Sequence, residues 1–408
     1  MGKKWKYNVS AIVFGSSAPL CGFFIRNRQL IRALSMLNLS VDIVEFGFKD
    51  RGTHKKPEDS ELDNIQRFIL PCVSQRPTRN STYSPLRQLA FQLESLKIVS
   101  LAGILRRSHI VMFTSCLQIM PALVSRIMGA KIILDINDVN SRVALRTQNP
   151  TTRTIHYLLW RPIESLCCSL ANIVIVNKED EGDFLNRFMS VNQSKIFVLK
   201  TCLEENQNLN NAQLELEVSK FHFGKEKVVL FLSNMSTFMN IRSAKYIINE
   251  LAPSLYKLDE FKDVEFVLAG IGSDTLQPLT SNVMITGTLS QAAVDALVNR
   301  ADICIDPAII SGGIKTKIQH YLQKGKVIIT TPSGAEGINL YGRKDVAFLK
   351  PRIEDFEKTL KHALRELTQL KKLAANNRDI YEKQFSWKTF FNQIQKLMEK
   401  IDKTNNQH

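Results

Sequence analysis

Residues 311–337 read Ser311-Gly-Gly-Ile-Lys-Thr-Lys-Ile-Gln-His-Tyr-Leu-Gln-Lys-Gly-Lys-Val-Ile-Ile-Thr-Thr-Pro-Ser-Gly-Ala-Glu-Gly337, which predicts a loop, a short helix, a buried strand and a second glycine-rich loop. A further strand is expected just before, over Asp302–Asp306, so the helix from Ile314 begins at the carboxyl edge of a parallel sheet. The first N–H groups of such a helix have no partner within it, and they commonly bind phosphate. The stretch therefore predicts an α/β fold with an anion site at the edge of a sheet.

The expected helix has an apolar face and a basic flank. At 100° per residue the apolar face holds Ile314, Ile318, Tyr321 and Leu322, and the flank holds Lys317, His320 and Lys324. Lys317 and His320 are therefore expected to reach toward the same region. Gly312 and Gly313 allow a close approach to the helix start, and Lys315 adds positive charge, as suits the leaving phosphates of a nucleotide-linked substrate. The alternative is an ordinary βαβ turn with solvated lysines.

The residues from Gly313 to Ile338 also carry a family resemblance. Their order is Gly-Ile-Lys-x-Lys-Ile, an apolar helix, Gly325, Val-Ile-Ile-Thr-Thr-Pro and Gly-Ala-Glu-Gly-Ile. This pattern resembles the donor-site signature of retaining glycosyltransferases with the GT-B fold, and in particular the family-four enzymes of bacterial polysaccharide biosynthesis. The resemblance implies two Rossmann-like, doubly wound parallel-sheet domains facing across a cleft. It also implies a hexosyltransferase-type enzyme that moves a sugar from a nucleoside diphosphate sugar to a glycan or lipid-linked acceptor.

Length and charge limit the alternatives. The chain has 408 residues, 44% of them hydrophobic, which is enough for two domains that each have a core. Lys and Arg number 54 against 39 Asp and Glu, and the net charge of +15 favours a polyanionic partner: nucleic acid, an anionic membrane face or a lipid-linked phosphate. The excess is scattered and no zinc-finger or RNP-like motif occurs, so nucleic acid is not an expected partner.

Cysteine usage and hydropathy indicate the compartment. The seven cysteines include no Cys-x-x-Cys pair, and several lie in apolar runs, which is typical of reduced, buried thiols in a cytoplasmic protein. The N-terminal residues pass into a strand without a long apolar region, so we expect no signal peptide. No run reaches the roughly 18 to 20 apolar residues that a spanning helix needs. A cytoplasmic protein is expected, with any membrane contact peripheral and on the inner face.

The first half alternates strand and helix. Strands are expected at 9–14, 41–46, 65–70, 110–113, 131–135, 173–176 and 196–199. The first is followed by a glycine-containing loop that ends at Gly22, and then by a helix over 23–37. The loop lacks the Gly-x-Gly-x-x-Gly pattern, so a dinucleotide site is not favoured. The resemblance implies that Gly22 faces the acceptor and the donor phosphates.

Residues 85–107 form a predicted long helix whose apolar residues cover more than one face. Arg87 and the pair Arg106-Arg107 flank it. Two interpretations stay open: an interior helix, and a hydrophobic, basic-ended element that docks on an anionic membrane, which relatives often use to meet lipid-linked acceptors.

A second polar cluster follows the strand expected at 131–135. This strand delivers Asp135, Asn137, Asp138 and Arg142 to the carboxyl edge, where clefts in open α/β sheets form. The resemblance implies that this position looks toward the acceptor hydroxyl, which makes Asp138 and Arg142 candidates for orienting the acceptor. The alternative is an Asp that caps the next helix.

Residues 204–213 are polar and Asn-rich, so the linker is placed at 206–224. It separates an acceptor-side domain (1–205) from a nucleotide-sugar-binding domain (225–380). A C-terminal helix (381–408) is expected to cross back to the first domain. The resemblance implies this, because Phe385-Ser-Trp387 matches a recurrent feature of the family at the start of such a helix. Strands of the second domain are expected at 228–232, 264–269, 283–286, 302–305, 327–330 and 346–349.

The loop after the first of these strands departs from the resembled family. Many relatives place an Arg and a Lys there to neutralise the donor diphosphate, whereas this chain offers Asn234, Ser236 and Asn240. The cationic role is then expected to fall to Lys315 and Lys317. Gly272 belongs to an Ala-Gly-x-Gly run that resembles the family's contact near the nucleotide base.

A larger departure concerns two glutamates seven residues apart in the resembled family. The corresponding positions are Gly312 and His320, so neither carboxylate is present. His320 can still bond a donor hydroxyl or phosphate oxygen, although a lone His beside an apolar face is often structural. Gly334 and Glu336 follow the next strand, where Glu336 can accept from a sugar hydroxyl or simply start a helix.

Together these features predict a nucleotide-sugar-dependent glycosyltransferase that serves polysaccharide biosynthesis. No metal cluster is visible, and neither a metal nor a resident cofactor is expected. The missing glutamates favour one alternative, a catalytically weak GT-B protein that binds a glycan or a partner protein. A nucleotide-sugar epimerase is a third option, for which no carboxylate pair is found.

Overall fold

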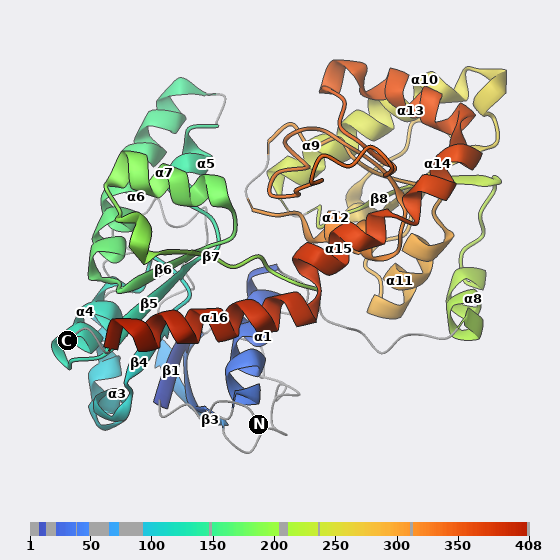
Figure 1. Ribbon diagram of the computed structural model, residues 1–408. Coiled ribbons are helices and arrows are strands. Elements are labelled where there is room, and N and C mark those ends of the chain that lie inside the picture. Colours follow the sequence, from blue (N-terminus) through green and yellow to red (C-terminus); the bar gives the residue numbers. More distant parts are fainter. Residues whose placement is uncertain are drawn as a thin grey trace. The chain divides into compact units, whose positions relative to one another are not determined.

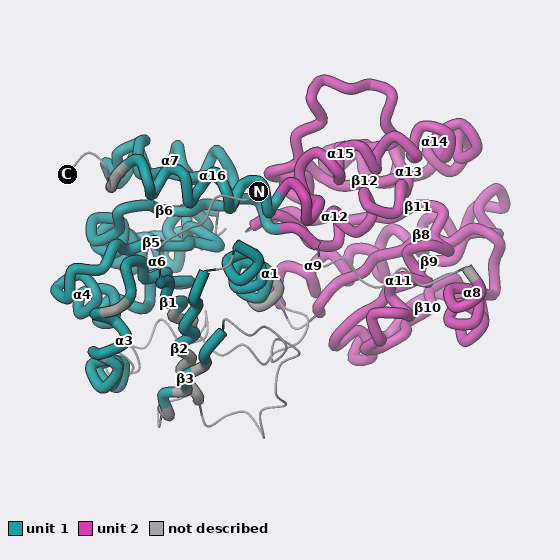
Figure 2. The backbone as a smooth tube through the Cα atoms, turned by 60° about the horizontal axis from the view of Figure 1, so that its bottom comes forward, with its two compact units in different colours: residues 1–201, 390–408 teal, residues 202–389 magenta. Residues whose placement is uncertain are grey.

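The computed structural model divides into two compact units, which Figure 2 shows in different colours. Unit 1 comprises residues 1–201 and 390–408, and unit 2 comprises residues 202–389. The structure describes residues 8–13, 22–37, 39–48, 65–72, 93–146, 149–203, 211–235, 237–310 and 313–405.

Unit 1 is built on a parallel sheet with the strand order β3-β2-β1-β4-β5-β6-β7. The strands are β1 (Asn8–Val13), β2 (Ser40–Phe48), β3 (Ile65–Cys72), β4 (Ile110–Phe113), β5 (Lys131–Ile136), β6 (Ile173–Val176) and β7 (Ile196–Val198). The helices are α1 (Gly22–Met36), η3 (Leu96–Leu101), α3 (Ala102–Arg107), α4 (Ile119–Ile127), α5 (Asn140–Ala144), α6 (Pro150–Leu170), α7 (Glu179–Met189), η4 (Gln193–Lys195) and α16 (Trp387–Asn405), which starts in unit 2. The chain winds to one side of β1 and then to the other, which is a doubly wound topology.

Unit 2 repeats this plan with the order β10-β9-β8-β11-β12-β13. The strands are β8 (Lys227–Leu232), β9 (Val264–Ala269), β10 (Val283–Ile285), β11 (Ile303–Asp306), β12 (Val327–Thr330) and β13 (Phe348–Leu349). The helices are α8 (Asn211–Ser219), α9 (Phe238–Tyr246), η5 (Ile247–Leu251), α10 (Ala252–Tyr256), η6 (Asp259–Phe261), η7 (Ser273–Thr275), α11 (Gln291–Arg300), α12 (Thr316–Gln323), η8 (Ile353–Asp355), α13 (Phe356–Arg365), α14 (Leu367–Ala374) and α15 (Asn377–Phe385). The predicted fold class of two doubly wound parallel sheets is confirmed.

Helices cover both faces of the unit 2 sheet (Figure 1). Phe231 packs with α9, α10 and α13 on one face, and Leu230 packs with α11, α12 and α15 on the other. Because both faces are covered, the strands are near-continuous apolar runs rather than alternating ones. This is why the sequence located most strands to within two residues.

An ion pair inside unit 1 ties α1 to the sheet. Arg26, which has no exposed surface, donates from Nε to Asp135 Oδ2 at 2.7 Å and from Nη2 to Asp135 Oδ1 at 2.6 Å. Its Nη1 also donates to Asn177 Oδ1, Leu199 O and Thr201 Oγ1. Asp135, which the sequence placed at an open edge, is therefore an interior residue. Removing either partner would leave a buried charge, at a cost of about 3–5 kcal/mol.

Two segments differ from their predictions, and a third differs in its boundary. The described part of the helix predicted at 85–107 is helical, but residues 96–101 form the 3-10 helix η3 ahead of α3. Ile98 and Leu105 are buried there, whereas Leu93 and Val99 are exposed. The segment predicted as an irregular linker contains α8, which packs against α11. The C-terminal segment joins unit 1 from residue 390 onward, where Lys400 Nζ donates to Ile196 O at 3.1 Å.

Two general features can be stated for the described residues. Their helices include none that is both long and apolar enough to cross a membrane. Cys116, Cys167, Cys168, Cys202 and Cys304 are buried free thiols, as the sequence predicted for the cysteines in apolar runs.

Candidate active site

The strand order of unit 2 reverses between β8 and β11. The chain runs from β8 to β9 and β10 on one side, and then places β11 on the other side of β8. In open α/β sheets ligands bind outside the carboxyl ends of the strands at such a switch point. Ser233 follows β8 and Asp306 ends β11, so these two residues mark the floor of the candidate site.

Lys317, in the first turn of α12, joins these two strand ends. Its Nζ lies 2.8 Å from Asp306 Oδ1, 3.1 Å from Ser233 Oγ and 4.3 Å from the centre of the Phe231 ring. The residue is only 8% exposed. Burial lowers the pKa of Lys317 to about 8, while the charge of Asp306 acts in the opposite direction and that of Lys315 lowers it further. Lys317 therefore lies where the sequence placed it, but its ammonium group is paired within the protein.

The second oxygen of Asp306 has no hydrogen-bond partner among the described residues. Asp306 is 1% exposed, and its Oδ2 is one of the buried polar atoms left without a partner. Gly334 packs against it so closely that an added Cβ would lie 2.9 Å from Asp306 Oδ2 and 2.1 Å from Thr330 Oγ1. Only glycine fits at this position, which explains the glycine-rich turn after β12.

Gly313 and Lys315 lie just before α12 and are partly exposed. Lys315 is the N-cap residue, with extended backbone angles and no side-chain hydrogen bond to the helix start. The first N–H groups of α12 thus lack a side-chain cap, as an anion-binding helix start requires. Gly312 lies outside the described residues.

His320 is placed differently from the prediction. Its Nε2 lies 2.8 Å from Oδ1 of Asp295 on α11, and both side chains are less than a tenth exposed. Burial would raise the pKa of Asp295, but the hydrogen bond and charge of His320 outweigh burial and lower it. Lys317 and His320 therefore contact different partners, Asp306 on β11 and Asp295 on α11. The two side chains thus differ in their contacts from the expectation of one shared region, and a donor contact of His320 stays a prediction.

The loops after β8 and β9 pack on each other. Gly270 has a φ of +121°, and an added Cβ would lie 2.2 Å from Ser233 O. Gly272 also has a positive φ and caps η7. Asn234 accepts at its carbonyl from Asn240 Nδ2 at 2.7 Å, which fixes the loop that leads into α9. Ser236 lies outside the described residues.

Glu336 follows β12 in the same turn as Gly334. It is partly exposed, and its backbone N–H donates to Ser333 O at 3.5 Å. The turn therefore holds Glu336 at the carboxyl edge of β12, beside the strand end that contacts Asp306.

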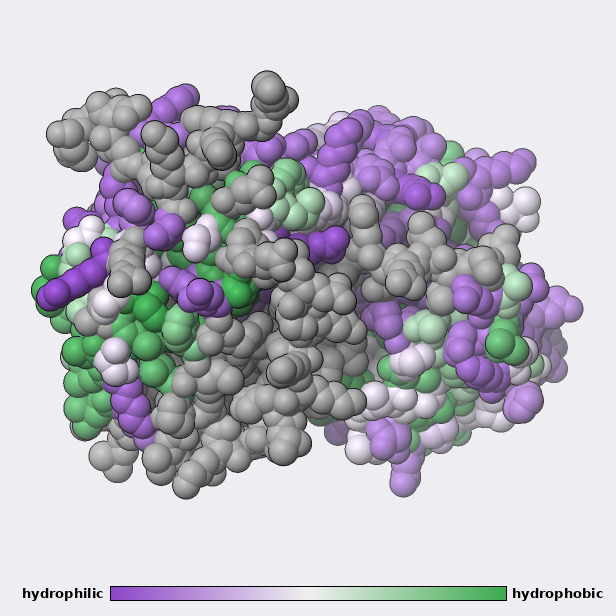
Figure 3. All heavy atoms as spheres, turned by 90° about the horizontal axis from the view of Figure 1, so that it is seen from below, coloured by the Kyte–Doolittle hydropathy of each residue, from purple (hydrophilic) through white to green (hydrophobic). Residues whose placement is uncertain are grey.

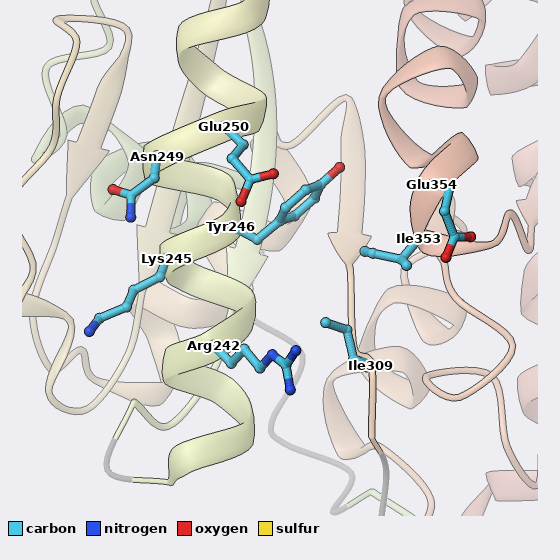
Figure 4. A pocket seen from close by; sticks show the side chains of 8 residues that line it. All are labelled: Arg242, Lys245, Tyr246, Asn249, Glu250, Ile309, Ile353 and Glu354. Carbon is cyan, nitrogen blue, oxygen red and sulfur yellow. The ribbon is translucent and has the colours of Figure 1, made fainter. Parts of the chain in front are cut away.

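A groove beside α9 was not predicted. It is lined by Arg242, Lys245, Tyr246, Asn249, Glu250, Ile309, Ile353 and Glu354. Arg242 and Tyr246 point from the helix toward Ile309 and Ile353, whereas Lys245 points away (Figure 4). Arg242 is a basic side chain less than one turn beyond Asn240, so α9 itself supplies a cation near the loop that the sequence left without one.

In unit 1 two of the predicted acceptor residues, Asp138 and Arg142, follow β5. Asp138 follows β5, and its Oδ1 is a buried atom without a hydrogen-bond partner among the described residues. Arg142 on α5 forms an ion pair with Asp180 on α7. Gly22 is the first residue of α1, and the loop before it lies outside the described residues.

The structure adds residues that the sequence reasoning missed here. Glu181 on α7 is 1% exposed, and its Oε1 lies 3.4 Å from Nζ of the buried Lys178. A Lys and a Glu three residues apart look like a surface pair of a helix, so no pattern in the sequence distinguished them. Only their position after β6, a strand neighbouring β5, could have indicated a site.

The described part of the chain shows no candidate metal site. It contains no group of three or more His, Cys, Asp or Glu side chains that could hold a metal ion.

Most of unit 2 matches a known protein family. Residues 226–368 match the family described as Glycosyl transferases group 1. The matched region covers all the strands of the unit 2 sheet. The predictions of a glycosyltransferase and of the GT-B resemblance are confirmed, and Lys317, Asp306 and Ser233 all lie within the matched region. No curated protein matches the chain with significance.

Solved structures share the fold along the whole chain. Sucrose-phosphate synthase from Thermosynechococcus elongatus is 13% identical, with 98% of this chain and 100% of that one covered and a TM-score of 0.73. Anabaena HepE in complex with UDP-glucose is 14% identical, with 96% and 99% covered and a TM-score of 0.68. A glycosyltransferase from Rickettsia africae is 17% identical, with 97% and 98% covered and a TM-score of 0.64. At these identities the likeness shows the fold.

Proposed function

We propose that the chain is a retaining glycosyltransferase that moves a sugar from a nucleoside diphosphate sugar to a glycan or lipid-linked acceptor in cell-surface polysaccharide synthesis. The observation that carries the proposal is the uncapped start of α12, with Gly313 and Lys315, at the switch point of unit 2. The complex of HepE with UDP-glucose supports it, because a protein of the same fold binds this class of donor.

In this proposal the departing diphosphate binds at the start of α12. The helix N–H groups and Lys315 stabilise the negative charge that develops on the leaving group. Lys317 and Asp306 form a buried pair of zero net charge, so their role is to hold the strand ends and the helix start in place. Asn234 and Gly272 lie at the neighbouring strand ends and contact the nucleotide, and Glu336 accepts from a sugar hydroxyl.

The acceptor side is proposed for unit 1, with Gly22, Asp138 and Arg142 facing the acceptor. The donor's own phosphate oxygen takes the proton of the acceptor hydroxyl, as the resemblance implies for retaining enzymes. A strong protein base is then not required, and the reaction needs no resident metal or cofactor.

The competing candidate is a weak enzyme that acts as a glycan- or partner-binding module. The contacts of His320 with Asp295 and of Lys317 with Asp306 favour it, because both side chains are engaged within the protein. Calorimetry of the full chain with UDP-, GDP-, ADP- and dTDP-linked sugars decides between the two. Binding of one donor, followed by transfer seen by mass spectrometry, supports the enzyme, whereas no binding to any donor supports the module.

We also propose peripheral contact with an anionic membrane through the surface of η3, α3 and α4. Leu93, Val99, Leu123 and Ile127 are between 39% and 77% exposed. Figure 3 shows hydrophobic side chains gathered at the left of the molecule, on the part of unit 1 that holds α3 and α4. No Asp or Glu occurs between Glu94 and Asp135, whereas Lys97, Arg106 and Arg126 do. Exposed apolar side chains among cations suit the interface of an anionic bilayer.

A further inference from the structure

Three polar atoms that have no hydrogen-bond partner among the described residues lie at one edge of unit 1. They are Asn137 Nδ2, Asp138 Oδ1 and Glu181 Oε2, all buried. Asn137 and Asp138 follow β5 directly, and Glu181 lies in the first turn of α7, which follows the neighbouring strand β6. Buried polar atoms in native proteins are nearly always hydrogen-bonded, so three at one sheet edge indicate that something else binds them.

Several neighbouring groups of this cluster have partners. Asn177 Nδ2 donates to Asn137 O at 2.7 Å, which fixes the backbone after β5. Glu181 Oε1 faces Nζ of Lys178 at 3.4 Å, so Oε2 is the oxygen left over. Arg142 and Asp180 pair with each other beside it. The three unpartnered atoms therefore lie beside groups whose positions are fixed by contacts within unit 1.

The charge around Glu181 determines which hydrogen bonds it can make. Burial raises the pKa of Glu181 to about 8; Lys178 opposes this shift, Asp138 and Asp180 add to it, and Arg142 opposes it. At neutral pH Glu181 is therefore mostly protonated, and its free oxygen can donate. The cluster then offers two donors, from Asn137 and Glu181, and one acceptor, from Asp138.

This mixed set of donors and acceptors suits a neutral ligand better than a charged one. A phosphate or carboxylate would face the carboxylate of Asp138, and a cation would face the amide N–H groups of Asn137. A hydroxyl group both donates and accepts, so two neighbouring hydroxyls can use all three atoms. We propose that Asn137, Asp138 and Glu181 bind a pair of adjacent hydroxyl groups on the acceptor sugar. This inference rests on the proposed function, and it adds that the acceptor presents a free diol to unit 1.

The test uses the full-length protein and simple sugars, without any donor. Saturation-transfer NMR with methyl α-glucoside, α-mannoside and α-galactoside measures binding by wild type and variants. Glu181→Leu is expected to weaken the best-bound glycoside at least about tenfold, the effect of losing a hydrogen bond to a buried group. Glu181→Gln keeps an N–H donor and is expected to bind within about threefold of wild type at neutral pH. Glu179→Gln, on the exposed part of the same helix turn, is the control.

Glycoside binding measured at several pH values distinguishes a direct contact of Glu181 with the sugar from a purely structural role. Wild-type binding should weaken as the pH rises through about 8, where Glu181 loses its proton, while binding by Glu181→Gln should stay constant. This comparison still decides the question if Glu181→Leu fails to fold. Binding by Glu181→Leu at the wild-type level, a wild-type profile without pH dependence, or no glycoside binding by wild type would overturn the inference. Donor calorimetry on the same samples separates this result from failure of the proposed function, because Asn137, Asp138 and Glu181 do not contact the donor in that proposal.

Discussion

Lys317 Nζ lies 2.8 Å from Asp306 Oδ1 at the switch point of unit 2, and both side chains are buried. A pair of opposite charges in the interior has little net field at a distance. The positive charge that meets a donor diphosphate must then come from the helix start and from partly exposed basic residues. Lys315, at the cap of α12, is such a residue, and the proposed function gives Lys317 the role of holding the site in place.

The first prediction separates these two lysines. Lys315→Ala should raise the KM for the donor about tenfold and leave the thermal midpoint within a few degrees, because it removes one charge-assisted contact. Initial-rate kinetics and calorimetric unfolding measure the two effects. A donor KM that does not change would contradict the assignment of Lys315.

Lys317→Ala should act mainly on stability. It leaves the carboxylate of Asp306 buried without its partner, at a cost of about 3–5 kcal/mol in the free energy of unfolding. The double variant Lys317→Met with Asp306→Asn should recover most of this loss, since no buried charge remains. Urea unfolding of the three proteins tests it, and equal stability of Lys317→Ala and wild type would show that the pair does not stabilise the fold.

Gly334→Ala should be destabilising although glycine-to-alanine changes are often neutral. An alanine Cβ would lie 2.1 Å from Thr330 Oγ1 and 2.9 Å from Asp306 Oδ2, so β12 or the end of β11 must move. Forced contacts of this kind cost about 1–3 kcal/mol. Gly103→Ala on α3 is the matched control, because its Cβ would meet nothing within 4 Å and should stabilise by about 0.5–1 kcal/mol.

Stability should depend on pH through Glu181. Its pKa rises from the ordinary value of 4.5 to about 8 in the folded protein. Between these values the folded state holds a proton that the unfolded state has released, so the free energy of unfolding falls as the pH rises through this window and levels off above it. Glu181→Gln lacks this group. The variant should therefore gain stability relative to wild type from about pH 5 to about pH 8, as urea midpoints at several pH values would show. A constant difference across the series would contradict the shift.

The sequence predicts the strands of this protein better than the partners of its buried polar side chains. Apolar runs such as Val264–Ala269 predict their strands well, because a strand buried on both faces is determined by its own composition. The location of Lys317 at the strand ends also follows from the pattern of loop and helix. Its pairing with Asp306 does not, nor does that of His320 with Asp295, because the partners come from other elements that only the packing of helices brings near. Glu181 illustrates the same limit: its neighbours along the chain predict a solvated helix start, and the fold buries it.

The surface of η3, α3 and α4 gives the last prediction. Ile127, which is 77% exposed on α4, should insert at the interface of an anionic bilayer, where Lys97, Arg106 and Arg126 meet lipid phosphates. Sedimentation of the full chain with vesicles should therefore be strong when they contain phosphatidylglycerol and weak when they contain only phosphatidylcholine. Ile127→Glu should weaken binding to the anionic vesicles about tenfold or more, because it removes apolar burial and adds repulsion. Leu279→Glu is the control for an exposed leucine in unit 2, where a 66% exposed side chain is replaced in the same way. Equal sedimentation of Ile127→Glu and wild type would mean that this face does not contact the membrane.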